Sequence, residues 1–366
     1  MPICATAEGT TRYRNRFSER VAPHHFRLAR SLTLASIGIG TYLGDPDERT
    51  DANYTEAIVR AVELGVNVID SAANYRFQRS ERSIGSALNL LFSDGFERDE
   101  IVICTKGGYL PFDGVPPHDV RGYVEKAFVR PGIASFDDFV GGSHCMTPAY
   151  LQNQLEQSLA NMGVDCVDLY YIHNPESQLP HVSVAEFEHR LSLAFEMLEQ
   201  NRAAGRIKFY GVATWNGFRV APSAREYHSF SRMIELAQKT GGNDHGFRFI
   251  QLPFNLAMAE ALTMVNQSVS GKDMTLIEAA TELGVAVMAS ASMLHGRVAQ
   301  RLPDDLRQAL GNLATDAQSA IQFVRSIPGL TTALVGMSQP QHVEENMQLA
   351  TVEPLTKEEF ERLFLQ

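Results

Sequence analysis

Residues 63–70 read ELGVNVID, and this stretch decides the fold because a helical pattern ends in it and a strand-like run begins. The apolar residues before Gly65 fall on one helical face, and a β-branched apolar run follows at once. A glycine just past a helix adopts the left-handed conformation without a Cβ penalty, so Gly65 marks a helix-to-strand turn. The same pattern at Gly163, Gly205 and Gly284 indicates α/β units in series.

Eight short apolar runs, separated by helical patterns, are candidate strands. They span 32–40, 66–70, 101–105, 167–173, 207–213, 247–252, 285–290 and 330–336. No GxGxxG motif follows the first run, which disfavours an open doubly wound sheet. The alternation predicts an α/β fold of the (β/α)8 TIM-barrel type, as a single domain over residues 31–366. We expect residues 1–30 to form an arm that is disordered or draped on the barrel.

Three connections are much longer than is usual between a strand and a helix, namely 107–146, 214–228 and 253–272. Each follows a candidate strand, so all three would lie at the C-terminal face of the barrel, where loops form active sites. The first connection is rich in Pro and Gly, and we expect it to form an ordered cap over the pocket.

Composition excludes several classes of function. The chain has 366 residues, is 44% hydrophobic and carries a net charge of −11, with its basic residues scattered, so we expect no nucleic-acid partner. No apolar run approaches the ~20 residues that a membrane span needs. The four cysteines have no CxxC spacing, and we expect Cys104 and Cys166 to be small apolar core residues of a cytoplasmic protein. No histidine or cysteine pair has the spacing of metal ligands, so no metal site is predicted.

Polar residues stand at the C-terminal ends of neighbouring candidate strands, where a barrel would bring them to one rim. Asp70 and His173 end the second and fourth runs, Lys106 directly follows the third, and Tyr75 follows in the loop after the second. A phenol is a poor acid at neutral pH, but a lysine held by a carboxylate can stabilise its phenolate, and an imidazole can orient a substrate oxygen. This set predicts a proton donor without a nucleophile, and hydride from a nicotinamide cofactor would complete the chemistry.

Five ordered motifs resemble the aldo-keto reductase superfamily, in the group that includes bacterial reductases and the β subunits of voltage-gated potassium channels. The resemblance extends from about Ser36 to about Ala350. Its motifs are GVNVIDSAANY (65–75), CTKGG (104–108), YIHNP (171–175), IQLPFNLAM (250–258) and ALVGMSQPQHVEEN (333–346).

The resemblance implies a role for individual residues. Tyr75 would be the general acid, tuned by Lys106 and Asp70, and His173 would orient the carbonyl. The cofactor-binding residues that it implies are Thr214, Gln251, Ser290, Arg297, Gly336, Ser338, His342, Glu345 and Asn346. Candidates for the substrate pocket are Asn174, Trp215 and Phe218. NADP(H) is favoured over NAD(H), although Gly336 and His342 stand where many relatives grip the 2′-phosphate with Lys and Arg.

The expected activity is the reduction of an aldehyde or ketone to an alcohol, or the reverse, by a cytoplasmic monomer or homo-oligomer. Aromatic residues in the long loops hint at an apolar or aromatic carbonyl substrate. Two alternatives stay open: a regulatory subunit that senses nicotinamide nucleotide with little turnover, and a non-redox lyase or isomerase that uses Lys106 as a base or Schiff-base amine.

Overall fold

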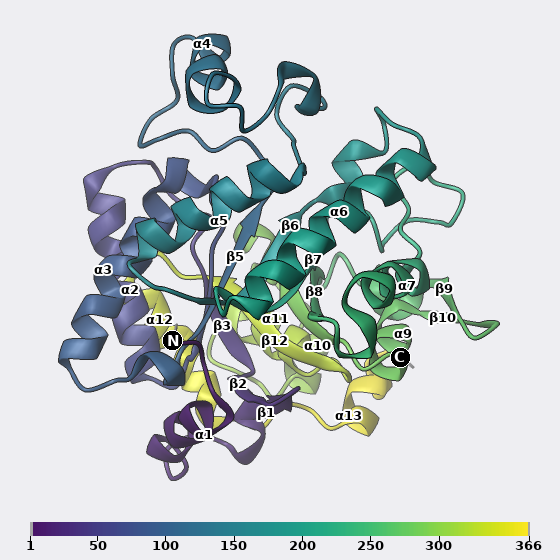
Figure 1. The fold of residues 1–366 in the computed structure, drawn as a ribbon. Helices are drawn as coiled ribbons and strands as arrows, with labels where there is room; N and C mark the ends of the chain where they lie inside the picture. The colour runs from purple at the N-terminus through teal and green to yellow at the C-terminus, as the bar shows by residue number, and fades with distance from the viewer. Residues whose placement is uncertain (1–2, 365–366) are drawn as a thin grey trace.

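Eight parallel strands close into a barrel in the computed structural model, which describes residues 3–364 (Figure 1). Each strand pairs with the next along the chain, and the last pairs with the first. The strands are β3 (Ile37–Gly40), β4 (Val68–Asp70), β5 (Val102–Gly107), β6 (Val167–His173), β7 (Ile207–Ala213), β8 (Phe247–Pro253), β11 (Ala286–Ser290) and β12 (Leu330–Gly336). The predicted TIM barrel is confirmed.

A helix follows each barrel strand and leads to the next. These helices are α2 (Glu48–Glu63), α3 (Arg79–Ser93), α5 (Pro148–Met162), α6 (Val184–Ala203), α7 (Phe230–Gly241), α9 (Leu276–Glu282), α11 (Asp316–Arg325) and α12 (Pro340–Met347). Asp47 caps the start of α2, because its side chain accepts a hydrogen bond from the Thr50 amide. Gly65 and Gly163 follow α2 and α5 with φ of 103° and 65°, so both predicted helix-to-strand turns are confirmed.

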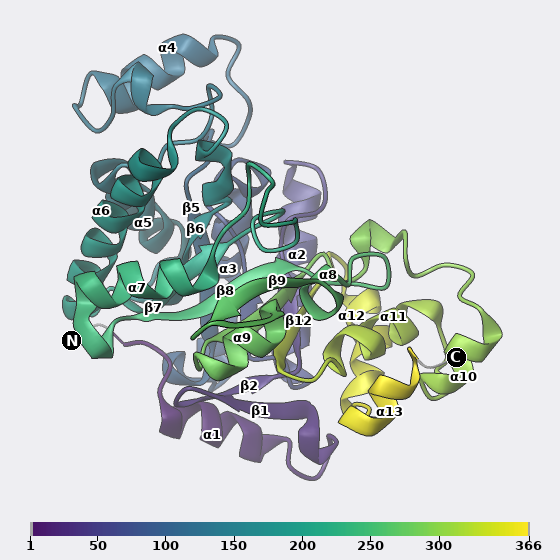
Figure 2. The same cartoon turned by 90° about the vertical axis from the view of Figure 1, so that its right-hand side faces the viewer.

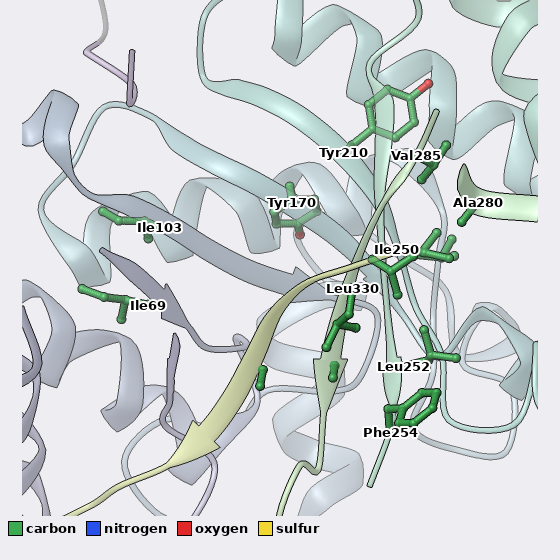
Figure 3. Close-up of a cluster of buried hydrophobic side chains, with 14 of the residues drawn as sticks. Ile69, Ile103, Tyr170, Tyr210, Ile250, Leu252, Phe254, Ala280, Val285 and Leu330 are labelled. Atoms are coloured by element: carbon green, nitrogen blue, oxygen red, sulfur yellow. The ribbon is translucent and has the colours of Figure 1, made fainter. Parts of the chain in front are cut away.

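Side chains along the strands alternate between two apolar layers. Val68, Val102 and Cys104 face the barrel interior, and Ile69 and Ile103 join the layer between strands and helices (Figure 3). Full burial of one such isoleucine stabilises the fold by roughly 1.5–3 kcal/mol. Cys104 is therefore the small apolar core residue that the sequence predicts.

The run 32–40 is not one strand, as the sequence suggested, but two strands that part at Ser36. β2 (Leu32–Ala35) pairs antiparallel with β1 (Phe26–Ala29), outside the barrel, whereas β3 belongs to the barrel. The Ser36 amide donates to the His25 carbonyl, and the Ser36 carbonyl accepts from the Ala333 amide, so the partner strand changes at this residue. Leucines of β2 pack with the interior residues at the start of β4 and β5, so the hairpin closes the N-terminal end of the barrel.

The N-terminal segment forms helix α1 (Ala7–Arg16) and is tied to the barrel by polar contacts and a disulfide. The guanidinium groups of Arg12 and Arg16 each lie 3.0 Å from the buried Glu100 carboxylate. Cys4 forms a disulfide with Cys166 across a sequence separation of 162 residues. The expectation that Cys166 is a free core thiol is therefore wrong, and cysteine usage no longer argues for a reducing compartment.

The excursion 107–146 contains α4 (Val120–Val124) and extends beyond α5 (Figures 1 and 2). Its apolar side chains form a separate cluster, in which Phe128 and Phe139 pack on Tyr150 of α5. Of its residues, only Tyr109 lines the central cavity described below. The expected cap over the pocket is therefore not observed, because the excursion buries its apolar side against a helix of the barrel wall.

The remaining elements lie in the other connections and at the C-terminus. They are α8 (Glu260–Thr263), β9 (Val265–Val269), β10 (Lys272–Thr275), α10 (Asp304–Ala309) and α13 (Lys357–Arg362). Strands β9 and β10 form a separate antiparallel hairpin. Among the residues that the structure describes, no helix is both long and apolar enough to span a membrane.

Candidate active site

A cavity of about 580 Å³ opens at the C-terminal ends of the barrel strands. The alternation along the strands explains which polar residues reach it. Asp70 follows the interior residue Val68 by two positions, and Gln251 follows the interior residue Phe249 in the same way. The side chains at the last interior positions of these strands therefore meet at the same end of the barrel.

Asp70 is the centre of a buried polar network at this rim. One carboxylate oxygen lies 2.6 Å from Lys106 Nζ, and the other accepts a hydrogen bond of 2.8 Å from Gln251 Nε2. Lys106 also donates to the Ser71 carbonyl at 2.6 Å. Burial opposes the ammonium form of Lys106, but the Asp70 carboxylate and the neighbouring Tyr75 together outweigh burial and raise the pKa of the lysine. Lys106 is therefore a fixed cation beneath the cavity.

Tyr75 lies over this cation, with its ring centroid 5.1 Å from Lys106 Nζ. Burial raises the pKa of the Tyr75 phenol, and Lys106 opposes that rise without reversing it. The cation alone therefore does not lower the pKa of the phenol below its ordinary value, and the role of Tyr75 as general acid stays a prediction. The phenol is instead held in its protonated form at neutral pH.

The backbone directly after Tyr75 is strained and well anchored. Arg76, Phe77 and Gln78 have φ of 47°, 57° and 69°, values that non-glycine residues rarely adopt. The buried Arg76 side chain donates to the Asp45 carbonyl at 3.0 Å and pairs with the Asp51 carboxylate at 2.5 Å. These contacts hold the turn that presents Tyr75 to the cavity.

His173 packs edge-on against Tyr75, with the ring centroids 5.8 Å apart. Burial and, next, the Lys106 charge lower the pKa of His173 well below its ordinary value, so the imidazole is neutral. Its Nδ1 atom is buried and has no hydrogen-bond partner among the described residues. The four residues predicted as catalytic therefore lie together at one end of the barrel.

The predicted cofactor residues divide into two groups. Six of them line the cavity: Thr214, Gln251, Ser290, Gly336, Ser338 and His342. The Thr214 hydroxyl is buried without a partner within residues 3–364. Arg297, Glu345 and Asn346 do not line the cavity, although Asn346 is buried on α12 and its Oδ1 atom has no partner in the same range.

Two of the three predicted substrate residues, Asn174 and Trp215, line the cavity. The expectation for Phe218 is wrong, because this ring is fully buried and packs edge-on against His228 and Phe230. A buried carboxylate positions the tryptophan: Glu176 accepts a hydrogen bond of 2.6 Å from the Trp215 amide.

Several lining residues were missed. Tyr42 packs edge-on against Tyr75, with the ring centroids 4.9 Å apart, and its place two residues after β3 is a signal that strand-end reasoning can use. Tyr109 was not missed, because it is one of the loop aromatic residues on which the expected apolar or aromatic substrate rests, and it lines the cavity two residues after β5. The segment 291–296 also lines it, with positive φ at the non-glycine residues Ala291, Leu294 and His295. No sequence pattern predicts positive φ at these three residues.

Known proteins resemble this chain over most of its length. The model of the Aldo/keto reductase family matches residues 36–364. A candidate β subunit of a voltage-gated potassium channel from Schizosaccharomyces pombe is 23% identical over 358 residues, covering 93% of this chain and 92% of that protein. D-threo-aldose 1-dehydrogenase from a Pseudomonas species is 24% identical over 343 residues, with coverage of 89% and 92%.

A solved structure shares the fold. The aldo/keto reductase from Klebsiella pneumoniae in complex with NADP and acetate superposes with a TM-score of 0.61 at 19% sequence identity, covering 94% of this chain and 96% of that chain. The resemblance predicted from the five sequence motifs is confirmed by the family match. This chain belongs to the aldo/keto reductase family.

Proposed function

We propose that this protein transfers hydride between a nicotinamide nucleotide and the carbonyl carbon of an aldehyde or ketone, with Tyr75 as the general acid. The observation that carries the proposal is the convergence of Tyr75 and His173 on one cavity, directly above the buried Lys106 cation. Asp70 fixes that cation by a charge-assisted hydrogen bond. This arrangement supports proton donation to an oxygen that becomes negative as the carbonyl is reduced.

The polar lining of the cavity fits a nicotinamide nucleotide. The buried hydroxyl of Thr214, which has no hydrogen-bond partner among the described residues, and the amide of Gln251 would hold the carboxamide. Ser338 and His342, at the start of α12, would hold the adenosine end. When bound, the nucleotide supplies the hydride that no side chain of the site can supply.

The side chains manage the proton. Tyr75 is protonated at neutral pH because burial raises its pKa, so it is able to donate from its hydroxyl oxygen. The Lys106 ammonium stabilises the phenolate that remains when the proton leaves. His173 is neutral and can hydrogen-bond the substrate oxygen, which orients the carbonyl toward Tyr75.

We propose an uncharged apolar or aromatic carbonyl compound as the substrate. The rings of Tyr42, Tyr109 and Trp215 line the cavity together with the apolar side chains of Leu43 and Met293. No lysine or arginine is among the described residues that line it. A carboxylate or phosphate on the substrate would therefore lose water without gaining a cationic partner.

On the family resemblance we propose NADP(H) as the nucleotide, with an affinity only slightly higher than that for NAD(H). A hydrogen bond to a charged group contributes about 1.5–3 kcal/mol, which is why a cationic grip on the 2′-phosphate separates the two nucleotides strongly. His342 is the residue that α12 contributes to the cavity lining, and no lysine or arginine is among the described lining residues. We expect less than about a tenfold difference between the dissociation constants of NADPH and NADH.

The test has two parts, nucleotide binding and turnover. Titration of the protein with NADPH and with NADH, followed by the fluorescence of Trp215 in the cavity wall, should give saturable binding of both. Nucleotide oxidation should then accelerate in the presence of aromatic aldehydes. Absence of binding to either nucleotide would contradict the proposal and favour a non-redox barrel enzyme.

A nucleotide-sensing regulatory subunit is the second candidate, because one relative of similar length is a candidate potassium channel β subunit. Both candidates require nucleotide binding, so turnover separates them. Tight nucleotide binding with no turnover on a broad aldehyde and ketone panel would favour the sensor.

A further inference from the structure

His144 is buried directly behind His173, although it belongs to the 107–146 excursion and not to a barrel strand. Its Nε2 atom lies 2.7 Å from the His173 carbonyl oxygen. The Tyr109 ring packs edge-on against both imidazoles, with centroid distances of 5.1 Å to His144 and 5.0 Å to His173. The excursion therefore contacts the candidate active site twice: His144 binds the backbone of His173, and Tyr109 lines the cavity.

A chain of hydrogen bonds fixes the tautomer of His144. Gln178 Oε1 lies 2.8 Å from an Arg190 guanidinium nitrogen, which can only donate, so the Gln178 amide nitrogen must face the other way. That nitrogen lies 2.8 Å from His144 Nδ1, which therefore accepts and carries no proton. The proton of the neutral imidazole is then on Nε2, where it is donated to the His173 carbonyl. Burial lowers the pKa of His144 to about 4, in agreement with a neutral ring.

The His173 carbonyl accepts this hydrogen bond at the point where the chain turns sharply. Asn174 has φ of 43° and ψ of 62°, so the peptide leaves the strand direction at the end of β6. Gly108 gives the space for the donor to approach: a Cβ atom there would lie 2.9 Å from His144 Nε2 and 3.1 Å from the His173 carbonyl oxygen. The backbone that carries His173 is thus held from one side by His144.

Backbone hydrogen bonds between the two ends of the excursion hold His144 in place. The Leu110 amide donates to the Ser143 carbonyl at 2.8 Å, and the Cys145 amide donates to the Gly108 carbonyl at 2.9 Å. These bonds join the two ends of the excursion next to His144. The outer part of the segment, with α4, lies beyond α5 and makes no contribution to the cavity lining.

We propose that His144 is a positioning residue, which fixes the backbone of His173 and the ring of Tyr109 and thereby orients the carbonyl substrate. The expected effect of His144 on kcat rests on the proposed carbonyl reduction. The tautomer of the His144 ring does not depend on that function. The excursion is on this account a structural part of the active site, with the Gln178 amide and the Arg190 guanidinium as the outer members of the same network.

The kinetic experiment compares three variants of the full-length protein. His144→Ala leaves the His173 carbonyl without its donor, and kcat should fall about tenfold, while the dissociation constant of NADPH stays within about twofold. His144→Gln keeps an amide donor of similar reach and should restore most of kcat. His25→Ala removes an equally buried imidazole at the opposite end of the barrel and should leave kcat unchanged. An unchanged kcat in His144→Ala, or an equal loss in His25→Ala, would overturn the proposal.

A second measurement does not depend on enzymatic activity or on whether the His144→Ala variant folds. In long-range ¹H–¹⁵N correlation spectra of histidine-labelled protein at pH 7, the imidazole signal that is lost in His144→Gln should be that of a neutral ring with its proton on Nε2. Arg190→Met should alter the same signal, because the Gln178 amide loses the partner that orients it. A protonated ring or a proton on Nδ1 would overturn the network. If the wild type binds no nicotinamide nucleotide but shows this tautomer, the proposed function fails and the network stands.

Discussion

The Lys106 ammonium lies 2.6 Å from the Asp70 carboxylate, at the ends of two neighbouring barrel strands where water has almost no access to either group. Removing two charges from water is costly, and their attraction offsets that cost only when both are present. The pair is therefore a coupled unit, and its proposed function is to hold a cation under the Tyr75 phenol.

Coupling between the two residues is directly measurable by urea unfolding. Asp70→Asn or Lys106→Met alone leaves one buried charge without its partner and should lower the free energy of unfolding by about 3–5 kcal/mol. The double variant buries no charge and should lose clearly less than the sum of the single losses. Additive losses would contradict the coupled pair.

The stability of the protein should fall in mild acid, in part because of His25. This imidazole is buried and donates from Nε2 to the Gly65 carbonyl, and burial lowers its pKa to about 4. The unfolded chain, with an ordinary histidine pKa of about 6.5, takes up the proton first as the pH falls. The free energy of unfolding should therefore decrease between about pH 6.5 and pH 4, by up to about 3 kcal/mol for this one group.

A matched pair of variants isolates that contribution. His25→Gln keeps an amide donor for the Gly65 carbonyl but does not titrate, so its unfolding free energy should change less between pH 7 and pH 4.5 than that of the wild type. His118→Gln replaces an exposed histidine and should retain the full wild-type dependence. Equal pH dependence in the two variants would show that His25 is not the group responsible.

The Cys4–Cys166 disulfide should stabilise the fold from the N-terminal side. Because the bond closes a loop of more than a hundred residues, Cys4→Ser should lower the free energy of unfolding by about 2–5 kcal/mol. The same variant should make α1 more sensitive to trypsin, since the helix then lacks its covalent tie and depends on non-covalent contacts such as the ion pairs of Arg12 and Arg16 with Glu100. A wild-type protein whose four thiols all react with a thiol reagent under non-reducing, denaturing conditions would contradict the bond.

The sequence predicts the barrel well because its signals are local. The runs 167–173, 207–213 and 330–336 coincide with β6, β7 and β12, since a glycine turn or a helical pattern bounds each run. The candidate catalytic residues follow from the same logic, because strand ends in a barrel meet at one rim.

The features that sequence reasoning missed depend on partners distant along the chain. The run 32–40 divides at Ser36 only because β1 and β12 offer it two different partners. The Cys4–Cys166 pair has no spacing signal. Phe218 is buried in the core, and the excursion packs its apolar side chains on α5. Both contacts depend on apolar surface from other parts of the chain, which no local sequence pattern indicates.

The rate of carbonyl reduction in Tyr75→Phe tests the central claim most directly. The substitution removes the hydroxyl proton and keeps the ring that packs against Tyr42 and His173, so NADPH should bind as it does to the wild type. The single-turnover rate with an aromatic aldehyde should fall by about 10²–10⁴-fold, the usual contribution of a general acid. Equal single-turnover rates in the variant and the wild type would contradict the assignment of Tyr75 as the proton donor.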